Sequence, residues 1–393
     1  METRSKFTSS QIPILSMSDN NYFLRHKRYI EYENDLENRL MVNKRKKICL
    51  KNENNLNPLL ITDSYINHLM EYNSGYFQLI GFKNLGNTCF INSVLQCFLH
   101  CTPLKNYFII NEHKHLNNNN NNKNFCFLCE FSKLIDLTKN TKEKYISPVK
   151  MINNMKLIFP NFNKGKQEDA HELLLFLLSY FEQSCIKFGI SLLTNYYNNI
   201  VLENNLISKI FSGKIISKVQ CGKCKTFSNT SDTFLNISLS ILNSFSLIES
   251  IEHYCQDEKL IGENQYFCDK CKIKCDSKRQ IIFSHLPKIL IFHLKRFDNN
   301  RRKVKKHIDF KIDYNFNKFC TNKVINTNYT LAAALIHEGY STNSGHYLTY
   351  VKNPNNNWYC FDDINVRLVN ENEVLQSHPY ILFYQQNLNK YCF

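Results

Sequence analysis

The setting of Cys89 points to nucleophilic chemistry. This residue lies in the stretch GFKNLGNTCFINSVLQCFLHC, residues 81–101, between a turn-rich lead-in and a long apolar run. The apolar residues after it recur at a helical period, and Thr88 can serve as the N-cap. A thiol reacts as the thiolate, and the dipole and free N–H groups at a helix start lower its pKa. The pattern therefore predicts a cysteine nucleophile in the first turn of a helix.

A cysteine nucleophile also needs a base, and His346 is the best candidate. Among the 13 histidines it stands out because the preceding Ser-Gly in STNSGHYLTYV leaves its surroundings open to a substrate. The segments HYLTYV and WYCFDD, joined by KNPNNN, predict a β-hairpin. A hairpin centred near Pro354 places Asp362 directly opposite His346, where a carboxylate would orient the imidazole. A slip of one residue would bring Asp363 there instead.

The lead-in to Cys89 offers a donor for a developing oxyanion. Acyl transfer requires such donors, and Asn84, five residues before Cys89, carries a side-chain amide. The backbone N–H of Cys89 is a second candidate. Alternatively, Asn84 and Asn87 merely shape the turn together with Gly86. The sequence leaves both interpretations of Asn84 open.

Two C-x-x-C pairs, CGKC at 221–224 and CDKC at 268–271, indicate a metal site. Four thiolates suit tetrahedral Zn²⁺ in a closed structural site, with the ligands Cys221, Cys224, Cys268 and Cys271. Cys275 can replace one ligand, although its spacing fits less well. A further pair, CFLC at 126–129, has no second pair and is interpreted as buried thiols.

Composition favours a folded intracellular protein. The 393 residues are 43% hydrophobic, and the 16 cysteines of such a chain more often stay reduced or bind metal than form disulfides. No stretch approaches the roughly 18 apolar residues of a membrane span, and the start lacks a secretory apolar region. We therefore expect the nucleus or cytoplasm and no membrane. The net charge of +15 invites a nucleic-acid partner, which we consider unlikely, because the usage of Asn, Lys, Ile, Tyr and Phe suggests AT-rich coding.

The order of elements predicts an α+β protein. Helical patterns occupy the first half, including a buried helix near 168–185, and strand-like segments follow from about residue 209. Residues 1–74 are polar and predict a flexible extension. The basic run at 44–47 is either a nuclear-targeting patch or part of a solvated arm. The six-asparagine run at 117–122 predicts a surface loop.

Taken together, these motifs resemble those of the ubiquitin-specific proteases. The stretch around Cys89 resembles their cysteine box, and GYSTNSGHYLTYVK with WYCFDD resembles their histidine box. GKQEDAHELL and LPKILIFHLKRF are similar to two elements between these boxes, and the C-x-x-C pairs occur where the family carries a zinc. The elements run in family order from about residue 80 to 385, and some segments look most like a nuclear and nucleolar subgroup.

The resemblance implies a papain-like catalytic domain at 75–388. Its helical thumb would span about 80–205, its zinc-stapled β fingers about 206–290 and its β-rich palm about 291–388. Such a domain cleaves the isopeptide or peptide bond after the C-terminal glycine of ubiquitin, so ubiquitin and ubiquitinated proteins are the implied partners.

The resemblance also implies roles for individual residues. Cys89 would be the nucleophile, His346 the general base, Asp362 its orienter and Asn84 the oxyanion donor. The residues implied to contact the ubiquitin tail are Gln167, Asp169, Gly345 and Tyr347. Three alternatives remain: a protease for a related modifier, a zinc-stapled nucleic-acid-binding module, and a non-catalytic ubiquitin receptor.

Overall fold

The structure is a computed structural model that describes residues 62–72, 78–111, 125–190, 205–297, 302–322, 324, 326–341 and 344–388, without the side chains of 186–190. The chain divides into two compact units, Met1–Asn57 and Pro58–Phe393, and the described residues all belong to the second. The basic run at 44–47 and the asparagine run at 117–122 lie outside the described residues, so both stay predictions.

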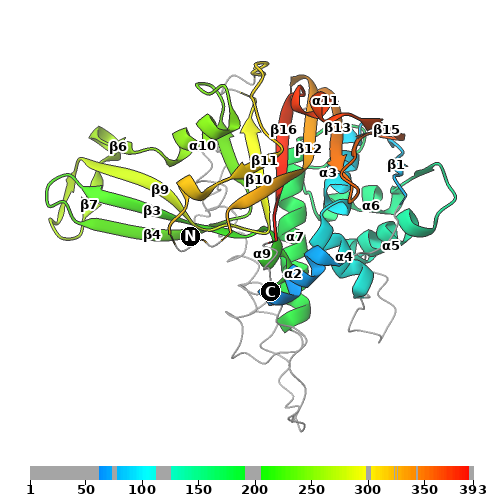
Figure 1. The fold of residues 1–393 in the computed structure, drawn as a ribbon, viewed down its shortest axis with the longest axis horizontal. Coiled ribbons are helices and arrows are strands. Elements are labelled where there is room, and N and C mark those ends of the chain that lie inside the picture. Colours follow the sequence, from blue (N-terminus) through cyan, green and yellow to red (C-terminus); the bar gives the residue numbers. More distant parts are fainter. Residues whose placement is uncertain are drawn as a thin grey trace, which may run out of the picture. The chain divides into compact units, whose positions relative to one another are not determined.

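The first half of the described domain is mainly helical (Figure 1). Its helices are α2 (Asp63–Glu71), α3 (Cys89–Leu99), α4 (Thr102–Ile110), α5 (Phe127–Asn140), α6 (Val149–Asn153), α7 (Ala170–Ile190) and α9 (Leu206–Phe211), with the short strands β1 (Gly81–Phe82) and β2 (Tyr145–Ile146). Every residue of α3 is buried, and its Phe98 packs against Phe181 of α7 with ring centroids 5.5 Å apart. Among the described residues, no helix has the length and apolarity to cross a bilayer.

Helix α2 lies in the segment expected to be a flexible extension. Thr62 caps this helix by accepting the backbone N–H of Tyr65, and the side chains of Ile66 and Leu69 are completely buried. The amide of Asn106 in α4 donates to the carbonyl of Leu69 at 2.7 Å. The folded unit therefore begins before residue 75, because an apolar stripe of three buried residues is enough to anchor this short, polar-looking helix.

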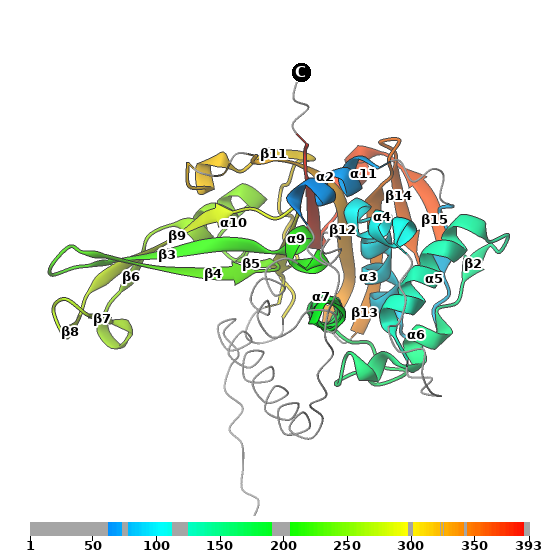
Figure 2. The same cartoon turned by 90° about the horizontal axis from the view of Figure 1, so that it is seen from below.

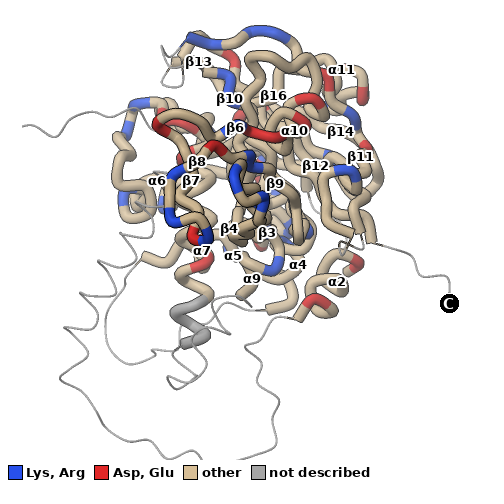
Figure 3. Tube along the Cα trace, turned by 90° about the vertical axis from the view of Figure 1, so that its left-hand side faces the viewer, with Lys and Arg blue, Asp and Glu red and all other residues tan. Residues whose placement is uncertain are grey.

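A narrow sheet, here called the finger sheet, projects from the domain (Figures 1 and 2). Its strands lie in the order β4 (Phe227–Phe234), β3 (Gly213–Cys221), β9 (Ser277–His285) and β6 (Glu258–Leu260), and the hairpin of β7 (Tyr266–Cys268) and β8 (Ile273–Cys275) lies at its far end. Basic and acidic positions are interspersed over this part of the molecule (Figure 3), and Arg279 forms an ion pair with Glu258 at 2.6 Å.

A large sheet, here called the palm sheet, completes the domain. Its order is β15 (Asn365–Val369), β14 (Trp358–Asp362), β13 (Ser344–Lys352), β12 (Asn328–Ser341), β16 (Pro379–Gln386), β10 (Ile289–Lys295) and β5 (Ile237–Ser240), with β11 (Asp313–Asn315) paired to β12. Helices α10 (Leu247–Cys255) and α11 (Glu371–Leu375) accompany it. Most helices precede most strands along the chain, and this order confirms the expected α+β class.

The palm sheet positions β13 directly beside α3 (Figure 2). Alternate residues of β13 belong to two different cores: Tyr347 and Val351 join the core that contains α3, whereas Leu348 and Tyr350 join the core that contains α10. This alternation is the period of two expected of a strand covered on both faces. Thr349 adds a polar connection, since its hydroxyl donates to the carbonyl of Ser93 in α3 at 3.1 Å.

Candidate active site

Cys89 is the first residue of α3 and follows a tightly hydrogen-bonded turn. The side-chain oxygen of Asn84 accepts the backbone N–H groups of Gly86 and Thr88, each at 3.1 Å. Thr88 is the N-cap residue, as expected, but its hydroxyl accepts the N–H of Leu85 at 2.9 Å instead of capping the helix. The lead-in thus fixes where α3 begins and so where the Cys89 thiol lies.

His346 and Asp362 meet side chain to side chain, with His346 Nε2 2.6 Å from Asp362 Oδ1. The predicted hairpin register was nevertheless wrong. The ladder pairs Thr349 with Phe361, so the hairpin is centred one residue later than expected, with Asn356 in the left-handed region at φ 63°. His346 and Asp362 are therefore diagonal neighbours rather than direct partners. A shift of two residues in the pairing keeps the side chains of His346 and Asp362 on one face of the hairpin. They therefore still lie within hydrogen-bonding distance.

Cys89 completes this chain of contacts. Its hydrogen bond with His346 is the main reason that the pKa of His346 rises to about 9; the bond to Asp362 adds to the rise, and partial burial opposes it. Because Asp362 occupies Nε2, the bond to Cys89 falls to Nδ1 of the imidazole. His346 is thus held as an imidazolium at neutral pH, the state that activates a neighbouring cysteine.

Asp363 has contacts that are separate from those of Asp362. Its carboxylate accepts the side-chain amides of Asn84 at 2.9 Å and of Asn92 at 2.7 Å. A left-handed backbone at Asp363, with φ 49°, turns the chain between the two carboxylates. The amide of Asn84 is therefore held by Asp363 while its oxygen shapes the turn. The turn interpretation of Asn84 is confirmed, and its role as an oxyanion donor stays a prediction.

Sequence reasoning missed two residues near the site: Asn92, which bonds to Asp363, and Tyr380, which bonds to Asp169. Asn92 lies on α3, one turn after Cys89, and is only 3% exposed. A buried polar residue inside an otherwise apolar helix needs a partner, and this is the signal that could have found it. Tyr380 lies on β16, and its sequence context offered no comparable signal.

Gln167 and Asp169 lie in the segment before α7 and bond to two strands of the palm sheet, Gln167 to β13 and Asp169 to β16. Gln167 accepts the backbone N–H of Gly345 at 2.9 Å. The carboxylate oxygens of Asp169 accept the Tyr380 hydroxyl at 2.9 and 2.8 Å, and Oδ1 also accepts the N–H of His171 at 2.8 Å. Desolvation raises the pKa of Asp169 above its ordinary value. Both residues implied to contact a substrate thus have structural partners here, although the side-chain nitrogen of Gln167 is buried without one.

A cleft of about 390 Å³ lies beside these residues. Asn87, Gln167 and Gly345 are among the residues that line it. Gly345 has φ 154°, and a Cβ there would lie 2.2 Å from the carbonyl oxygen of Glu338, so only glycine fits. Tyr347 does not reach the cleft surface in this structure, because it is completely buried.

The other cysteines near Cys89 are in different surroundings. Cys101 is buried, and burial raises its pKa to about 12. The expectation that Cys126 and Cys129 are buried is wrong, since both are partly exposed. They lie where α5 begins, at the surface-facing start of the helix, rather than in its apolar centre.

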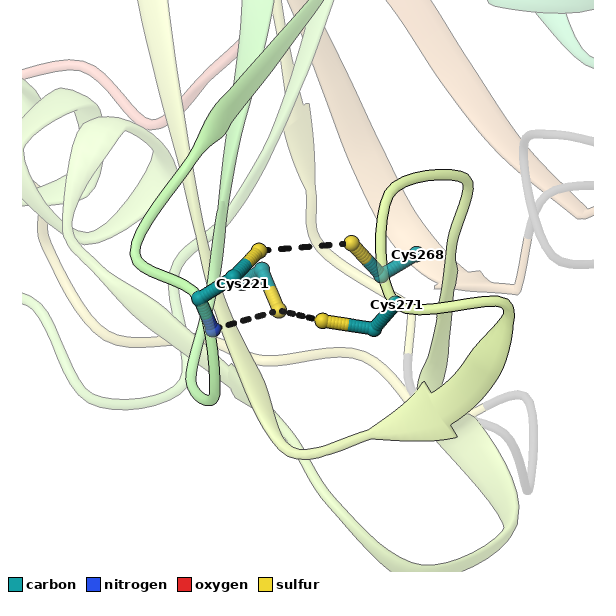
Figure 4. Close-up of side chains that lie close together, drawn as sticks. Cys221, Cys268 and Cys271 are labelled. Carbon is teal, nitrogen blue, oxygen red and sulfur yellow. Dashed lines mark hydrogen bonds between the residues drawn. The ribbon is translucent and has the colours of Figure 1, made fainter.

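A second group of side chains forms the cysteine cluster, which we define as Cys221, Cys224, Cys268 and Cys271. Their sulfurs all lie within 4.8 Å of one another, between the end of β3 and the β7–β8 hairpin (Figure 4). The sulfur of Cys224 lies 3.6 Å from that of Cys268, and the sulfur of Cys221 lies 4.0 Å from that of Cys271. Tetrahedral Zn²⁺ with bonds of about 2.3 Å separates its sulfurs by about 3.8 Å. The four residues therefore fit the metal.

The charges of the cysteine cluster also suit a cation. A hydrogen bond from Thr226 lowers the pKa of Cys224 to about 6. A hydrogen bond with Cys224 raises the pKa of Cys271 to about 12. A bound cation would favour the thiolate forms of both.

Comparison with known proteins assigns the chain to a family. The family model for ubiquitin carboxyl-terminal hydrolase matches residues 80–384. The chain belongs to the ubiquitin carboxyl-terminal hydrolase family. This confirms the resemblance to the ubiquitin-specific proteases, and the match extends from just before β1 into β16, the last strand of the palm sheet in sequence.

Individual members of the ubiquitin carboxyl-terminal hydrolase family are similar over most of the described domain. The chain is 34% identical over 307 residues to ubiquitin carboxyl-terminal hydrolase 23 of Arabidopsis thaliana, covering 77% of this chain and 35% of that protein. It is 32% identical over 315 residues to probable ubiquitin carboxyl-terminal hydrolase 16 of Schizosaccharomyces pombe, covering 78% and 66%. The chain thus spans between 22% and 66% of the length of four such curated relatives.

Solved structures of this family share the fold. The Ubp8-containing SAGA DUB module bound to monoubiquitin superimposes with a TM-score of 0.69 and 28% identity, covering 79% of this chain and 69% of that chain. The same module bound to ubiquitin aldehyde gives a TM-score of 0.68 with 25% identity, covering 79% and 70%.

Proposed function

We propose that this chain is a cysteine-type deubiquitinase, which hydrolyses the isopeptide or peptide bond after the C-terminal glycine of ubiquitin. The observation that carries the proposal is the chain of contacts from Cys89 through His346 to Asp362. Membership of the ubiquitin carboxyl-terminal hydrolase family supports the choice of substrate. A solved relative bound to monoubiquitin supports it further.

In the first step, the Cys89 thiolate attacks the carbonyl carbon of the last glycine of ubiquitin. Asp362 keeps the imidazole of His346 charged and oriented while the thiolate forms. The oxyanion that develops needs donors, and the Cys89 backbone N–H is one. The amide of Asn84 is the other: one of its N–H groups is held by Asp363, which aims the second.

In the second step, the bond to the leaving amine breaks. His346, as imidazolium, gives its proton to the amine nitrogen, and the product is a thioester between Cys89 and ubiquitin. His346, now neutral, takes a proton from a water molecule that attacks the thioester carbonyl. The thiolate leaves, and the imidazolium form of His346 is restored.

The cleft beside Gly345 is suited to a glycine-rich extended chain. Gln167 holds the N–H of Gly345 and so fixes one wall of this cleft. Its own buried nitrogen has no hydrogen-bond partner among the described residues, and a small rotation of the side chain would offer it to a carbonyl of the substrate. Close backbone walls favour residues without side chains, which is the chemistry of the terminal Gly-Gly of ubiquitin.

We also propose that the cysteine cluster holds a structural Zn²⁺. Cys221 and Cys224 would supply two thiolates from the end of β3, and Cys268 and Cys271 would supply two from the β7–β8 hairpin. The metal would fasten the end of the finger sheet and take no part in the reaction at Cys89.

Labelling with an electrophilic ubiquitin probe tests the proposed activity. The full chain should form a covalent adduct with the probe and cleave a fluorogenic ubiquitin substrate. Cys89→Ala should lose both while still binding ubiquitin, whereas the matched variant Cys255→Ala should keep both. A probe built on a related modifier tests the main alternative substrate. Equal labelling of Cys89→Ala, or labelling only by the related modifier, would refute the proposal.

A further inference from the structure

A fifth thiol lies against the cysteine cluster. The sulfur of Cys275 is 3.3 Å from that of Cys221, closer than the 4.0 Å between Cys221 and Cys271. Cys275 is nevertheless not one of the four residues whose sulfurs all lie within 4.8 Å of one another. Its thiol instead donates a hydrogen bond to the carbonyl of Tyr266, 3.8 Å away. Cys275 thus lies in contact with a candidate metal ligand without being needed as one.

The backbone holds this contact in place. Cys221 is the last residue of β3 and pairs with Ser277 of β9 in the register of the finger sheet. The next residue, Gly222, donates its N–H to the carbonyl of Asp276 at 2.8 Å. A Cβ at Gly222 would lie only 2.2 Å from that oxygen, so the close approach depends on glycine. Cys275 precedes this clamp by one residue, and its position beside Cys221 is therefore fixed by hydrogen bonds.

The two thiols differ in their access to solvent. Cys221 is 1% exposed, whereas Cys275 is partly exposed at the end of β8. A small oxidant in solution therefore reaches Cys275 first. The oxidised sulfur of Cys275 then lies in contact with the sulfur of Cys221. A disulfide holds its sulfurs about 2.05 Å apart, so closure requires the two atoms to approach by about 1.3 Å.

We propose that Cys275 and Cys221 form an oxidation-sensitive thiol pair, which opens the cysteine cluster when a peroxide is present. The inference rests on the proposed zinc site and goes beyond the proposed hydrolase activity. In this proposal Cys275 acts as the thiol that is oxidised first, a role separate from metal binding and from catalysis.

The reaction balances with hydrogen peroxide as the oxidant. Peroxide first oxidises the Cys275 thiol to a sulfenic acid, releasing one water. The Cys221 thiolate then attacks the sulfenic sulfur, and the leaving hydroxide takes up a proton to become a second water. The two sulfurs give two electrons to one peroxide molecule and form one disulfide. The metal then has only the three thiolates of Cys224, Cys268 and Cys271.

Loss of one ligand of four should release the metal. Structural Zn²⁺ sites are closed and four-coordinate, and their affinity depends on all ligands being deprotonated thiolates. A disulfide removes the Cys221 thiolate from that set. Reduction by a dithiol with zinc present should reverse the change, since the cluster is rebuilt from the same side chains.

Zinc release under peroxide is the test. The zinc-loaded full chain, carrying Cys89→Ala so that the candidate nucleophile consumes no oxidant, is treated with hydrogen peroxide beside a chromogenic zinc chelator. We expect zinc release together with a peptide in which Cys221 is linked to Cys275, detected by mass spectrometry. Adding Cys275→Ser should slow release at least about tenfold, whereas the matched Cys255→Ser should leave it unchanged.

Purification of Cys275→Ser without zinc would overturn the inference, because Cys275 would then be a ligand. Zinc release from Cys275→Ser as fast as from the parent chain would also overturn it, and so would the absence of the linked peptide from the oxidised parent. A parent chain without zinc would remove the basis of the inference as well. None of these readouts uses ubiquitin, so probe labelling of the reduced chain decides the proposed deubiquitinase activity separately.

Discussion

The candidate active site and the cysteine cluster are held together by different means. At the active site, protein groups hold one another: Asp362 holds His346, and Asp363 holds the amides of Asn84 and Asn92. In the cysteine cluster the sulfurs mainly contact one another, at 3.6 Å from Cys224 to Cys268 and 4.0 Å from Cys221 to Cys271. The contacts of the active site are hydrogen bonds between protein groups, whereas the cysteine cluster is a group of thiols that could hold a metal ion.

This difference indicates which change should disrupt each region. Hydrogen bonds within the active site should survive removal of any metal, and metal binding should survive removal of the catalytic side chains. The two regions also lie far apart in the domain, with β7 at the tip of the finger sheet and α3 beside the palm sheet (Figure 1). Loss of a catalytic side chain should therefore have the largest effect on turnover, and loss of the metal the smallest.

His346→Ala should have the largest effect. It removes the general base and its charge, so kcat should fall by roughly 10² to 10⁴. The fold should be kept because His346 is only partly buried. The measurement is kcat on a fluorogenic ubiquitin substrate, with zinc content as the control. A loss of less than tenfold, or a loss of zinc, would contradict the separation of the two regions.

Activity should fall as the pH rises through about 9. The raised pKa of His346 keeps the imidazolium present below that pH, and above it the proton for the leaving amine is lost, about tenfold per pH unit. The stability contributed by the charged imidazole is complete below its unfolded pKa and is lost as pH rises through about 9. A profile of kcat/KM measures this. Asp362→Asn should move the decline to lower pH, because it removes a group that raises the pKa.

Asp363→Ala should lower kcat by roughly tenfold to a hundredfold. Without this carboxylate the Asn84 amide is no longer aimed, and losing one oxyanion donor costs about 10² to 10³. The kinetics of the double variant Asn84→Ala/Asp363→Ala give the check. If Asp363 acts through Asn84, the double variant should be no worse than Asn84→Ala alone. Losses that multiply would show that Asp363 acts by another route.

Metal removal should have the smallest effect on chemistry. Chelation, or Cys268→Ser, should raise KM several-fold by loosening the finger sheet, while kcat changes little. Alkylation of Cys89 by iodoacetamide should keep its rate, since the active-site contacts do not involve the metal. A parallel collapse of kcat and of alkylation would mean that the two regions fold as one unit.

Local features of the site could be predicted from the sequence. The position of Cys89 at a helix start depends on a turn, a cap and an apolar period within about 20 residues, and all three are local. The two C-x-x-C pairs are likewise local, since each places two sulfurs on one knuckle. The contact between His346 and Asp362 was predicted with the wrong register. It survived because strand faces repeat every two residues.

Other features depend on contacts between distant segments. Asp363 meets Asn84 and Asn92 across more than 270 residues of sequence. Tyr347 was implied to line a channel, yet it is buried between His337 and Tyr380, with ring centroids 4.5 and 6.4 Å away. Residues from three separate strands determine that burial, and a sequence pattern that repeats within one strand carries no information about it.

The sequence by itself thus determined which residues can react, because a nucleophile at a helix start and paired thiols are products of short-range geometry. The tertiary structure decided how they are supported. It gave Asp362 and Asp363 different partners through one left-handed residue, recruited α2 into the domain, and placed Cys275 beside Cys221. These outcomes depend on which strands and helices pack together, and packing is decided by the free energy of the whole fold rather than by any one segment.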